Sequence, residues 1–164
     1  MSEIWIANAS PVIVLAKIEK LDLLLTHDRT VMIPEAVARE ILQAPAKDAA
    51  RRALDSGWGS KPVPVTTDVE VLEWGLGAGE TAVLSLAKQK KATAIVDDRA
   101  ARIACKALGI HFIGTLGVVL RSYREKRISS SVETLKALRQ AGLHLDDSVI
   151  RIALQKTTGE KWPK

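Results

Sequence analysis

Short apolar runs alternate along the chain with longer segments in which apolar residues recur every three or four positions. Runs of three or four residues have the length of short buried strands, and the wider spacing is that of one face of an α-helix. The runs expected to form strands span residues 4–7, 31–33, 62–65, 94–96 and 111–113. The segments expected to form helices span residues 10–24, 34–42, 46–55, 80–90, 98–108, 116–125, 132–140 and 147–156. Strands that alternate with helices in this way predict an α/β domain with a mostly parallel sheet.

Residues at the ends of these segments indicate where they begin and stop. Ser10 is the expected N-cap of the first helix, with Pro11 at its first helical position. Gly109 is suited to end the helix before it, because glycine accepts the left-handed conformation found just past helix C-termini. The prolines in 62–65 predict an edge strand, and the tail over 160–164 is expected to be loose.

The composition is that of an ordinary globular protein. Of the 164 residues, 47% are hydrophobic and 26% are charged. We therefore expect one domain over residues 1–164, with a core of about 4–128. Helices over about 130–156 would either pack on that core or form a dimer seam. No apolar run reaches the roughly 20 residues that span a bilayer, and the N-terminus lacks the features of a signal peptide.

The cysteine count and the net charge give weak indications of the cellular location and of the partner. Cys105 is the one cysteine, which excludes an intrachain disulfide and is compatible with a cytoplasmic location. We expect its side chain to pack in the core. The net charge of +5 mildly favours a polyanionic partner, although one Phe, one Tyr and four Trp provide no evident platform for stacked bases. The basic runs 88–91 and 121–127 are interpreted as solvated faces, with RNA backbone contact as the alternative. The isolated histidines, which have no metal-ligand spacing, are His27, His111 and His144.

Polar residues gather after the predicted strands, at the edge where parallel α/β sheets bind ligands. Each acid taken alone has a structural interpretation as a helix cap or a solvated residue, a role that stabilises by roughly 0.3–1 kcal/mol. Asp97 and Asp98 are harder to explain in this way, because a helix start needs only one of two adjacent aspartates. Clustered carboxylates suit a hard cation such as Mg²⁺ or Mn²⁺, which can activate water for attack on a phosphodiester. The candidate ligands and catalytic residues are Asn8, Glu40, Glu80, Asp97 and Asp98.

Two arginines follow the acidic pair on the predicted helix. Arg99 and Arg102 could contact a substrate phosphate or hold the acids in ion pairs. Pairing with the acids is the favoured interpretation for Arg102. Arg99 and Ser10 are kept as candidate substrate-binding residues.

Four segments together resemble the PIN-domain family, and in particular its small prokaryotic members of unknown function. They cover most of residues 4–128, and the combination of GAGE opening a helix, DDRAAR after a strand and a later GTLG is fairly specific. The resemblance implies a three-layer α/β/α fold with sheet order 3-2-1-4-5 and metal-dependent ribonuclease activity. It also implies that the acids of the family's site map onto Glu40, Glu80 and Asp98, with Asp97 beside the last. The matching segments are IANASPVIVLAKIEKLDLL, VMIPEAVAREIL, GLGAGETAVLSLAK and AIVDDRAARIACKALGIHFIGTLGVVLRSYREKRI.

One position departs from the family pattern. PIN nucleases usually carry an aspartate at the end of the first strand, where this chain has Asn8. An amide oxygen can still bind a hard cation but brings no charge. Two readings therefore stand beside each other: an active ribonuclease, or an impaired PIN-like module that binds RNA or a protein without cutting. A receiver-type Mg²⁺ domain is disfavoured, because its acidic pair would follow the first strand.

The resemblance also implies partners. Many small single-domain relatives are similar to the toxins of toxin–antitoxin pairs. We expect RNA as substrate, Mg²⁺ or Mn²⁺ as cofactor, a small antitoxin as inhibitor, a homodimer as the assembly, and no membrane association.

Overall fold

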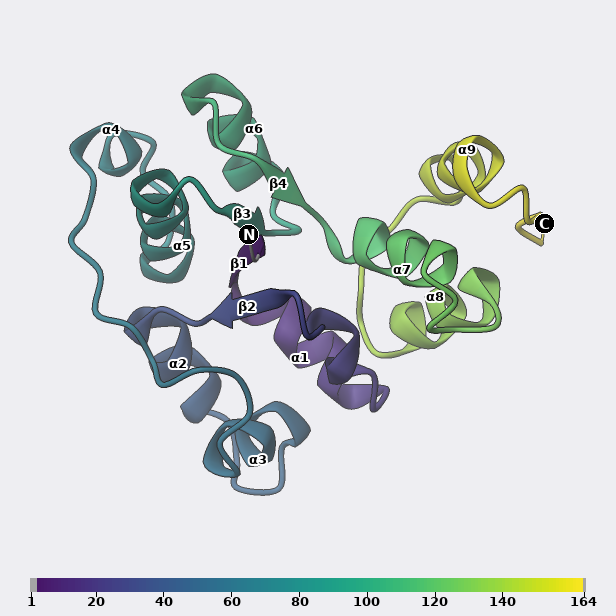
Figure 1. The fold of residues 1–164 in the computed structure, drawn as a ribbon, viewed down its shortest axis with the longest axis horizontal. Helices are drawn as coiled ribbons and strands as arrows, with labels where there is room; N and C mark the ends of the chain where they lie inside the picture. The colour runs from purple at the N-terminus through teal and green to yellow at the C-terminus, as the bar shows by residue number, and fades with distance from the viewer. Residues whose placement is uncertain (1–2, 164) are drawn as a thin grey trace.

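The computed structural model describes residues 3–163, and a four-stranded sheet lies at the centre of the chain (Figure 1). All three strand pairs are parallel, and the order across the sheet is β2-β1-β3-β4. In Figure 1 helix α5 lies on one side of the sheet and helix α1 on the other, which confirms the α/β prediction. The strands are β1 (Glu3–Ala7), β2 (Arg29–Met32), β3 (Thr93–Ile95) and β4 (Phe112–Ile113).

The predicted strand over 62–65 is reduced to one point of contact. In the described part of the chain this segment forms no strand, and Val63 makes a single parallel bridge with Pro34, just past the end of β2. Pro62 and Pro64 have no N–H to donate to a neighbouring strand, which is the physical reason that the pairing stops there. The segment still occupies the edge position beside β2, so the spatial order agrees with the expected 3-2-1-4-5.

Every predicted helix is present in some form, and one helix was not predicted. The segment 10–24 is divided, because Glu19 turns into the left-handed region (φ 58°) between two shorter helices. The unpredicted helix is the single turn α4, which Asp68 caps. The helices are α1 (Ala9–Lys17), the 3₁₀ turn η1 (Leu21–Leu24), α2 (Glu35–Leu42), α3 (Ala49–Asp55), α4 (Val69–Leu72), α5 (Ala78–Lys90), α6 (Arg99–Leu108), α7 (Thr115–Arg124), α8 (Ser131–Gln140) and α9 (Asp147–Thr157).

The N-terminus of α1 differs from its prediction. Asn8, not Ser10, is the N-cap residue, so Ser10 lies inside the first helical turn and is exposed. Pro11 is then the third residue of the helix. The shift matters for the site, because it places the Asn8 side chain at the junction between β1 and α1. Within the described residues that side chain makes no capping hydrogen bond to the helix.

The C-terminal helices pack on the domain. The fully buried side chains of Leu135 and Leu138 on α8 and of Ile150 and Leu154 on α9 belong to the same core as the sheet, and both helices contact α7. The tail was expected to be loose, but Glu160 and Trp162 make hydrogen bonds with α8 and α9, and residue 164 lies outside the described residues. Glu160 accepts hydrogen bonds from the Ser130 hydroxyl and the Ser131 amide, and the Trp162 ring nitrogen donates to Asp147 at 2.9 Å.

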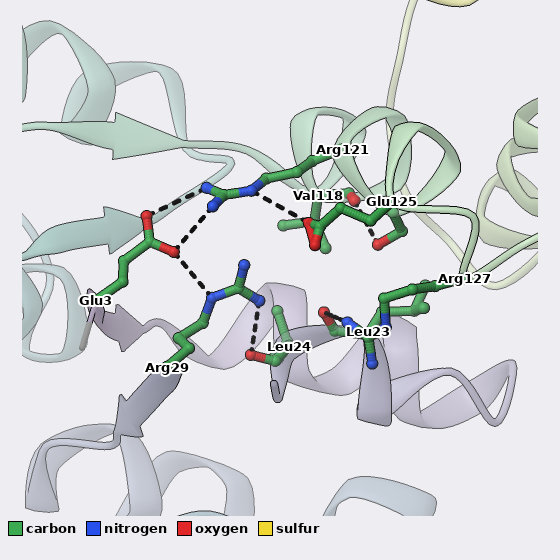
Figure 2. A network of polar contacts seen from close by, with 9 residues as sticks. Glu3, Leu23, Leu24, Arg29, Val118, Arg121, Glu125 and Arg127 are labelled. Atoms are coloured by element: carbon green, nitrogen blue, oxygen red, sulfur yellow. Dashed lines mark hydrogen bonds and ion pairs between the residues drawn. The ribbon is translucent and has the colours of Figure 1, made fainter. Parts of the chain in front are cut away.

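A polar network joins the amino ends of the strands to α7 (Figure 2). Arg121 donates to both carboxylate oxygens of Glu3, at 3.1 and 3.2 Å, and Arg29 donates to the same carboxylate at 3.1 Å. The buried Arg29 guanidinium also lies 3.4 Å from the centre of the Trp5 ring. Arg127 donates to the Leu23 carbonyl oxygen at 3.0 Å. Part of the basic run 121–127 therefore holds the protein together, rather than forming only a solvated face.

Candidate functional site

The candidate site lies at the carboxyl ends of β1 and β3, which are neighbours in the sheet. The register pairs Ala7 with Ile95, and the backbone N–H of Asn8 donates to the Ile95 carbonyl oxygen at 3.1 Å. The chain therefore leaves the sheet at Asn8 directly beside the segment that continues into Asp97 and Asp98. This is the juxtaposition that the sheet order implied.

Three of the predicted site residues meet around Gly79 in the first turn of α5. Asn8 is 3% exposed, and its amide nitrogen donates to a carboxylate oxygen of Glu80 at 3.2 Å. A Cβ atom on Gly79 would lie 2.9 Å from a carboxylate oxygen of Glu40 and 3.3 Å from the Asn8 amide oxygen. Helices α2 and α5 pack against each other, which brings Glu40 to this point. We call the set Asn8, Glu40 and Glu80 the amide–carboxylate cluster.

The electrostatics of the cluster favour a cation. Partial burial raises the pKa of the Glu40 carboxyl, and the nearby charge of Glu80 raises that pKa further. The Glu40 side chain still keeps solvent access at the surface. A positive ion placed between the two carboxylates would relieve their repulsion and favour the ionised form of both.

The Asn8 amide oxygen carries the strongest indication of a ligand. It is buried and has no hydrogen-bond partner within residues 3–163. A buried carbonyl-type oxygen without a partner costs about 1–3 kcal/mol, so such atoms in native proteins call for an explanation. A Glu40 carboxylate oxygen borders the same space beside Gly79, and it cannot donate a hydrogen bond to the Asn8 oxygen when it is ionised.

Asp97 and Asp98 are engaged with helix N-termini. Asp97 accepts from the Thr115 amide at 2.8 Å and from the Thr115 hydroxyl at 2.6 Å, at the start of α7. Asp98 is exposed and caps α6, accepting from the Ala101 amide at 2.9 Å. Each carboxylate oxygen retains further acceptor capacity. Gly114 permits the close approach at Asp97, because a Cβ there would lie 3.1 Å from an Asp97 oxygen.

The donor set fits a hard divalent cation of low protein coordination. Within the described residues no three histidine, cysteine, aspartate or glutamate side chains come together as a metal-binding group. The cluster instead offers two carboxylates and one neutral amide oxygen. Mg²⁺ and Mn²⁺ accept oxygen ligands of this kind and keep several waters. Asn8, Glu40 and Glu80 would hold the ion, and Asp97 and Asp98 stand at the adjoining strand end.

The remaining candidates lie around this centre. Arg99 is exposed at the start of α6. The Arg102 guanidinium stacks 5.3 Å from the centre of the Phe112 ring, and in the part of the chain described it forms no ion pair with the acids, contrary to the favoured interpretation. Cys105 is fully buried, and burial raises the pKa of its thiol to about 11, as expected for a core residue. His27 pairs with its neighbour Asp28.

Sequence reasoning missed the two residues that shape the site from outside the acid set. Gly79 leaves the space in which the cluster meets, and Thr115 holds Asp97 with two hydrogen bonds. The signals were present in the motifs GAGE and GTLG, but nothing in a motif says which side chain a glycine makes room for. That information is in the packing of α2 on α5 and of α7 on β4.

Comparison with known proteins identifies the family. The model of a family described as a PIN domain, DUF3368, matches residues 4–159. A comparison with curated proteins found no match. In residues 3–163, no helix is long and apolar enough to cross a bilayer. The PIN domain is a nuclease-type fold, and proteins with this domain generally use divalent metal ions. The match covers nearly the whole chain, and the chain therefore belongs to the PIN-domain family of unknown function.

Proposed function

We propose that this protein is a metal-dependent ribonuclease that cleaves RNA phosphodiester bonds at the amide–carboxylate cluster. The observation that carries the proposal is the buried Asn8 amide oxygen, which has no hydrogen-bond partner within residues 3–163 and borders the same space beside Gly79 as a Glu40 oxygen. A cation ligand explains both that atom and the paired charges of Glu40 and Glu80. The absence of an aspartate at position 8 then weakens the site without removing it.

The chain's own residues divide the work. A divalent ion bound at the cluster would supply an activated water and stabilise charge on the phosphate oxygens. Asn8 orients Glu80 through the hydrogen bond at 3.2 Å. Glu40 reaches the space beside Gly79 from α2, where its carboxylate would hold the ion together with Glu80. Thr115 fixes Asp97 at the edge of the site, and Asp98, whose carboxylate keeps acceptor capacity beside its bond to the Ala101 amide, would orient the waters of the ion.

The test is cleavage of a mixed RNA pool by the purified protein with Mn²⁺, with EDTA and Asp98→Asn as controls. Asparagine is as good an N-cap as aspartate, so α6 should survive the change. Asp48→Asn is a matched variant, because Asp48 caps α3 in the same way but lies outside the site. We expect cleavage to be lost with EDTA and in Asp98→Asn, and retained in Asp48→Asn.

Two outcomes would contradict the proposed roles. Full cleavage by Asp98→Asn would refute the role of Asp98. No cleavage by folded wild-type protein, together with no binding of Mn²⁺ or Mg²⁺ at millimolar concentration, would favour the impaired module that binds RNA or protein without cutting.

We also propose that the ribonuclease acts as a toxin whose activity a small partner protein restrains. The resemblance to toxin-type PIN proteins supports this role. The exposed side chains of Val69, Leu72 and Trp74 in and after α4 supply an apolar surface for such a partner or for a second copy of the chain. Induced expression of the wild-type protein in a bacterium should stop growth, and expression of Glu80→Gln should not. Equal growth with both proteins would contradict the toxin role.

A further inference from the structure

A groove of about 540 Å³ opens beside the candidate site, between α6 and the segment that leads into α9. Asp97 lines one part of it, next to the strand end that carries the amide–carboxylate cluster. We call it the α6 groove. The groove is also lined by Arg99, Arg102, Lys106, Phe112, His144 and Val149.

Three cations of α6 face this groove. Arg99, Arg102 and Lys106 follow one another at spacings of three and four residues, which places them on one face of the helix. All three are exposed, and within residues 3–163 none of them forms an ion pair with an acid. Arg121 and Arg139, by contrast, are paired with carboxylates. Like charges at this spacing repel each other, so an anionic ligand would stabilise the face.

Two acids of the groove offset part of this positive charge. Asp97 is engaged by the Thr115 amide and hydroxyl, and Asp146 is the exposed residue before α9. Three cations against two acids leave the lining with one net positive charge, in a protein whose overall charge is +5.

Apolar surface lies between the cations. Ile103 and Val149 are 49% and 47% exposed, and the half-buried Phe112 ring lies under the Arg102 guanidinium. Alternating cationic and apolar contacts match a single nucleic-acid strand, whose phosphates pair with cations while its bases rest on apolar or stacked groups. Phe112 is the chain's one phenylalanine, and the fold places it at this groove.

We propose that the α6 groove binds the backbone of single-stranded RNA next to the bond that is cleaved. The inference rests on the proposed ribonuclease function. An RNA strand that lies in the groove would reach Asp97, next to the cluster at which the proposed cleavage takes place. Contacts with three phosphates would make the logarithm of the binding constant fall with the logarithm of salt concentration with a slope of about −2, which is roughly 0.7 for each phosphate.

The experiment measures binding of a fluorescently labelled single-stranded RNA by anisotropy, in EDTA so that no cleavage takes place. The test variant is Arg99→Gln/Arg102→Gln. The control is Arg52→Gln/Arg124→Gln, which lowers the net charge equally and removes two exposed arginines outside the groove. We expect the groove variant to bind about tenfold more weakly, with a salt slope smaller in magnitude by about 1.4, and the control to bind like the wild type.

The outcomes separate the groove from the chemistry. Equal loss in both variants, or no RNA binding by the wild type, would overturn the inference, as would an acidic peptide that competes as well as unlabelled RNA. RNA binding that depends on the groove, in a protein that does not cleave with Mn²⁺, would support the inference while refuting the nuclease. Equal thermal midpoints of the two variants verify that both are folded.

Discussion

Asn8 is the residue on which the proposed metal site depends. It is buried just past the end of β1, its side-chain nitrogen donates to Glu80, and its amide oxygen borders the space beside Gly79 that a Glu40 oxygen also borders. A neutral ligand between two carboxylates lowers the repulsion of the metal-free site, at the cost of weaker attraction for a cation. We therefore expect an asparagine at this position to lower the metal affinity of the proposed site and to raise the stability of the metal-free fold.

Asn8→Asp should reverse this exchange. A third carboxylate replaces the donor to Glu80, so we expect the metal-free protein to lose about 1–2 kcal/mol of stability and to bind Mn²⁺ more tightly. Calorimetric titration and thermal unfolding with and without Mn²⁺ measure the two effects. Gln140→Glu adds the same charge at the end of α8, where it should leave the Mn²⁺ affinity unchanged and lower stability by only about a few tenths of a kcal/mol. Unchanged or weaker Mn²⁺ affinity would mean that residue 8 does not face the ion.

Glu40→Gln should stabilise the metal-free protein while removing metal binding. The pKa of the Glu40 carboxyl is raised by burial and by Glu80, so its charge opposes folding at neutral pH. After solvent screening we expect a gain of roughly a few tenths of a kcal/mol. The gain is largest above the raised pKa and disappears as the pH falls through it, because the wild-type carboxyl then takes up a proton.

Urea unfolding between pH 4 and pH 8 checks this effect. The matched variant is Glu35→Gln on the same helix, whose carboxylate favours the helix N-terminus and approaches Arg39 at 4.0 Å. It should lower stability slightly or leave it unchanged. A stability loss in Glu40→Gln at neutral pH would show that Glu40 already has a favourable partner.

At the scale of elements, the first turn of α5 controls the space of the site. Gly79 is buried in that turn, where alanine would be favoured by about 1 kcal/mol on helix propensity alone. Gly79→Ala places a Cβ 2.9 Å from a Glu40 oxygen and 3.3 Å from the Asn8 oxygen. The Glu40 side chain can move away, so we expect stability within about 1 kcal/mol of the wild type.

Function should respond more strongly than stability. The displaced Glu40 can no longer share an ion with Asn8, so Mn²⁺ affinity should fall at least tenfold and cleavage with it. Ala78→Gly, one position earlier on the exposed surface, is the control that changes helix propensity in the opposite sense. If Gly79→Ala kept full Mn²⁺ affinity, the ion would have to be held away from the cluster.

At the scale of the whole molecule, Glu3 ties the N-terminal strand to α7. Its carboxylate accepts from Arg29 and from Arg121, 118 positions further along the chain (Figure 2). Burial alone would raise the pKa of Glu3, but the hydrogen bonds and charges of the two arginines outweigh it and lower that pKa. A carboxyl with a lowered pKa contributes stability at neutral pH, and the contribution is lost as the pH falls through the folded-state value.

Glu3→Gln should therefore destabilise the protein by about 1–3 kcal/mol at pH 7, because Arg29 would remain buried without its carboxylate. The difference from the wild type should shrink as the pH falls below 4.5. Chemical unfolding at pH 7 and pH 3.5 measures it. Glu133→Gln, which removes an exposed pair with Lys136 on α8, should show almost no difference at either pH.

The local pattern of the sequence determined the elements and the family. Apolar spacing located β1, β3 and nearly all the helices, because the pattern of apolar residues that marks the face to be buried is contained within each segment. Gly109 ended α6 as expected, with a φ of 70°. The motifs around Asn8, Glu80 and Asp98 identified the PIN domain, which the family match confirms.

Only the tertiary structure decided how the polar residues combine. Asn8 and Glu80 are 72 positions apart, and their hydrogen bond depends on how α5 packs against β1. Among the residues that the structure describes, the Asn8 amide oxygen has no hydrogen-bond partner, whereas Asp97 accepts from Thr115 and Asp98 from the Ala101 amide at the start of α6. The five polar residues that the sequence predicted as one site are thus divided into a cluster of three and two acids bound to helix N-termini. The physical reason is that the packing of the helices in three dimensions, and not their spacing along the chain, determines which oxygens meet.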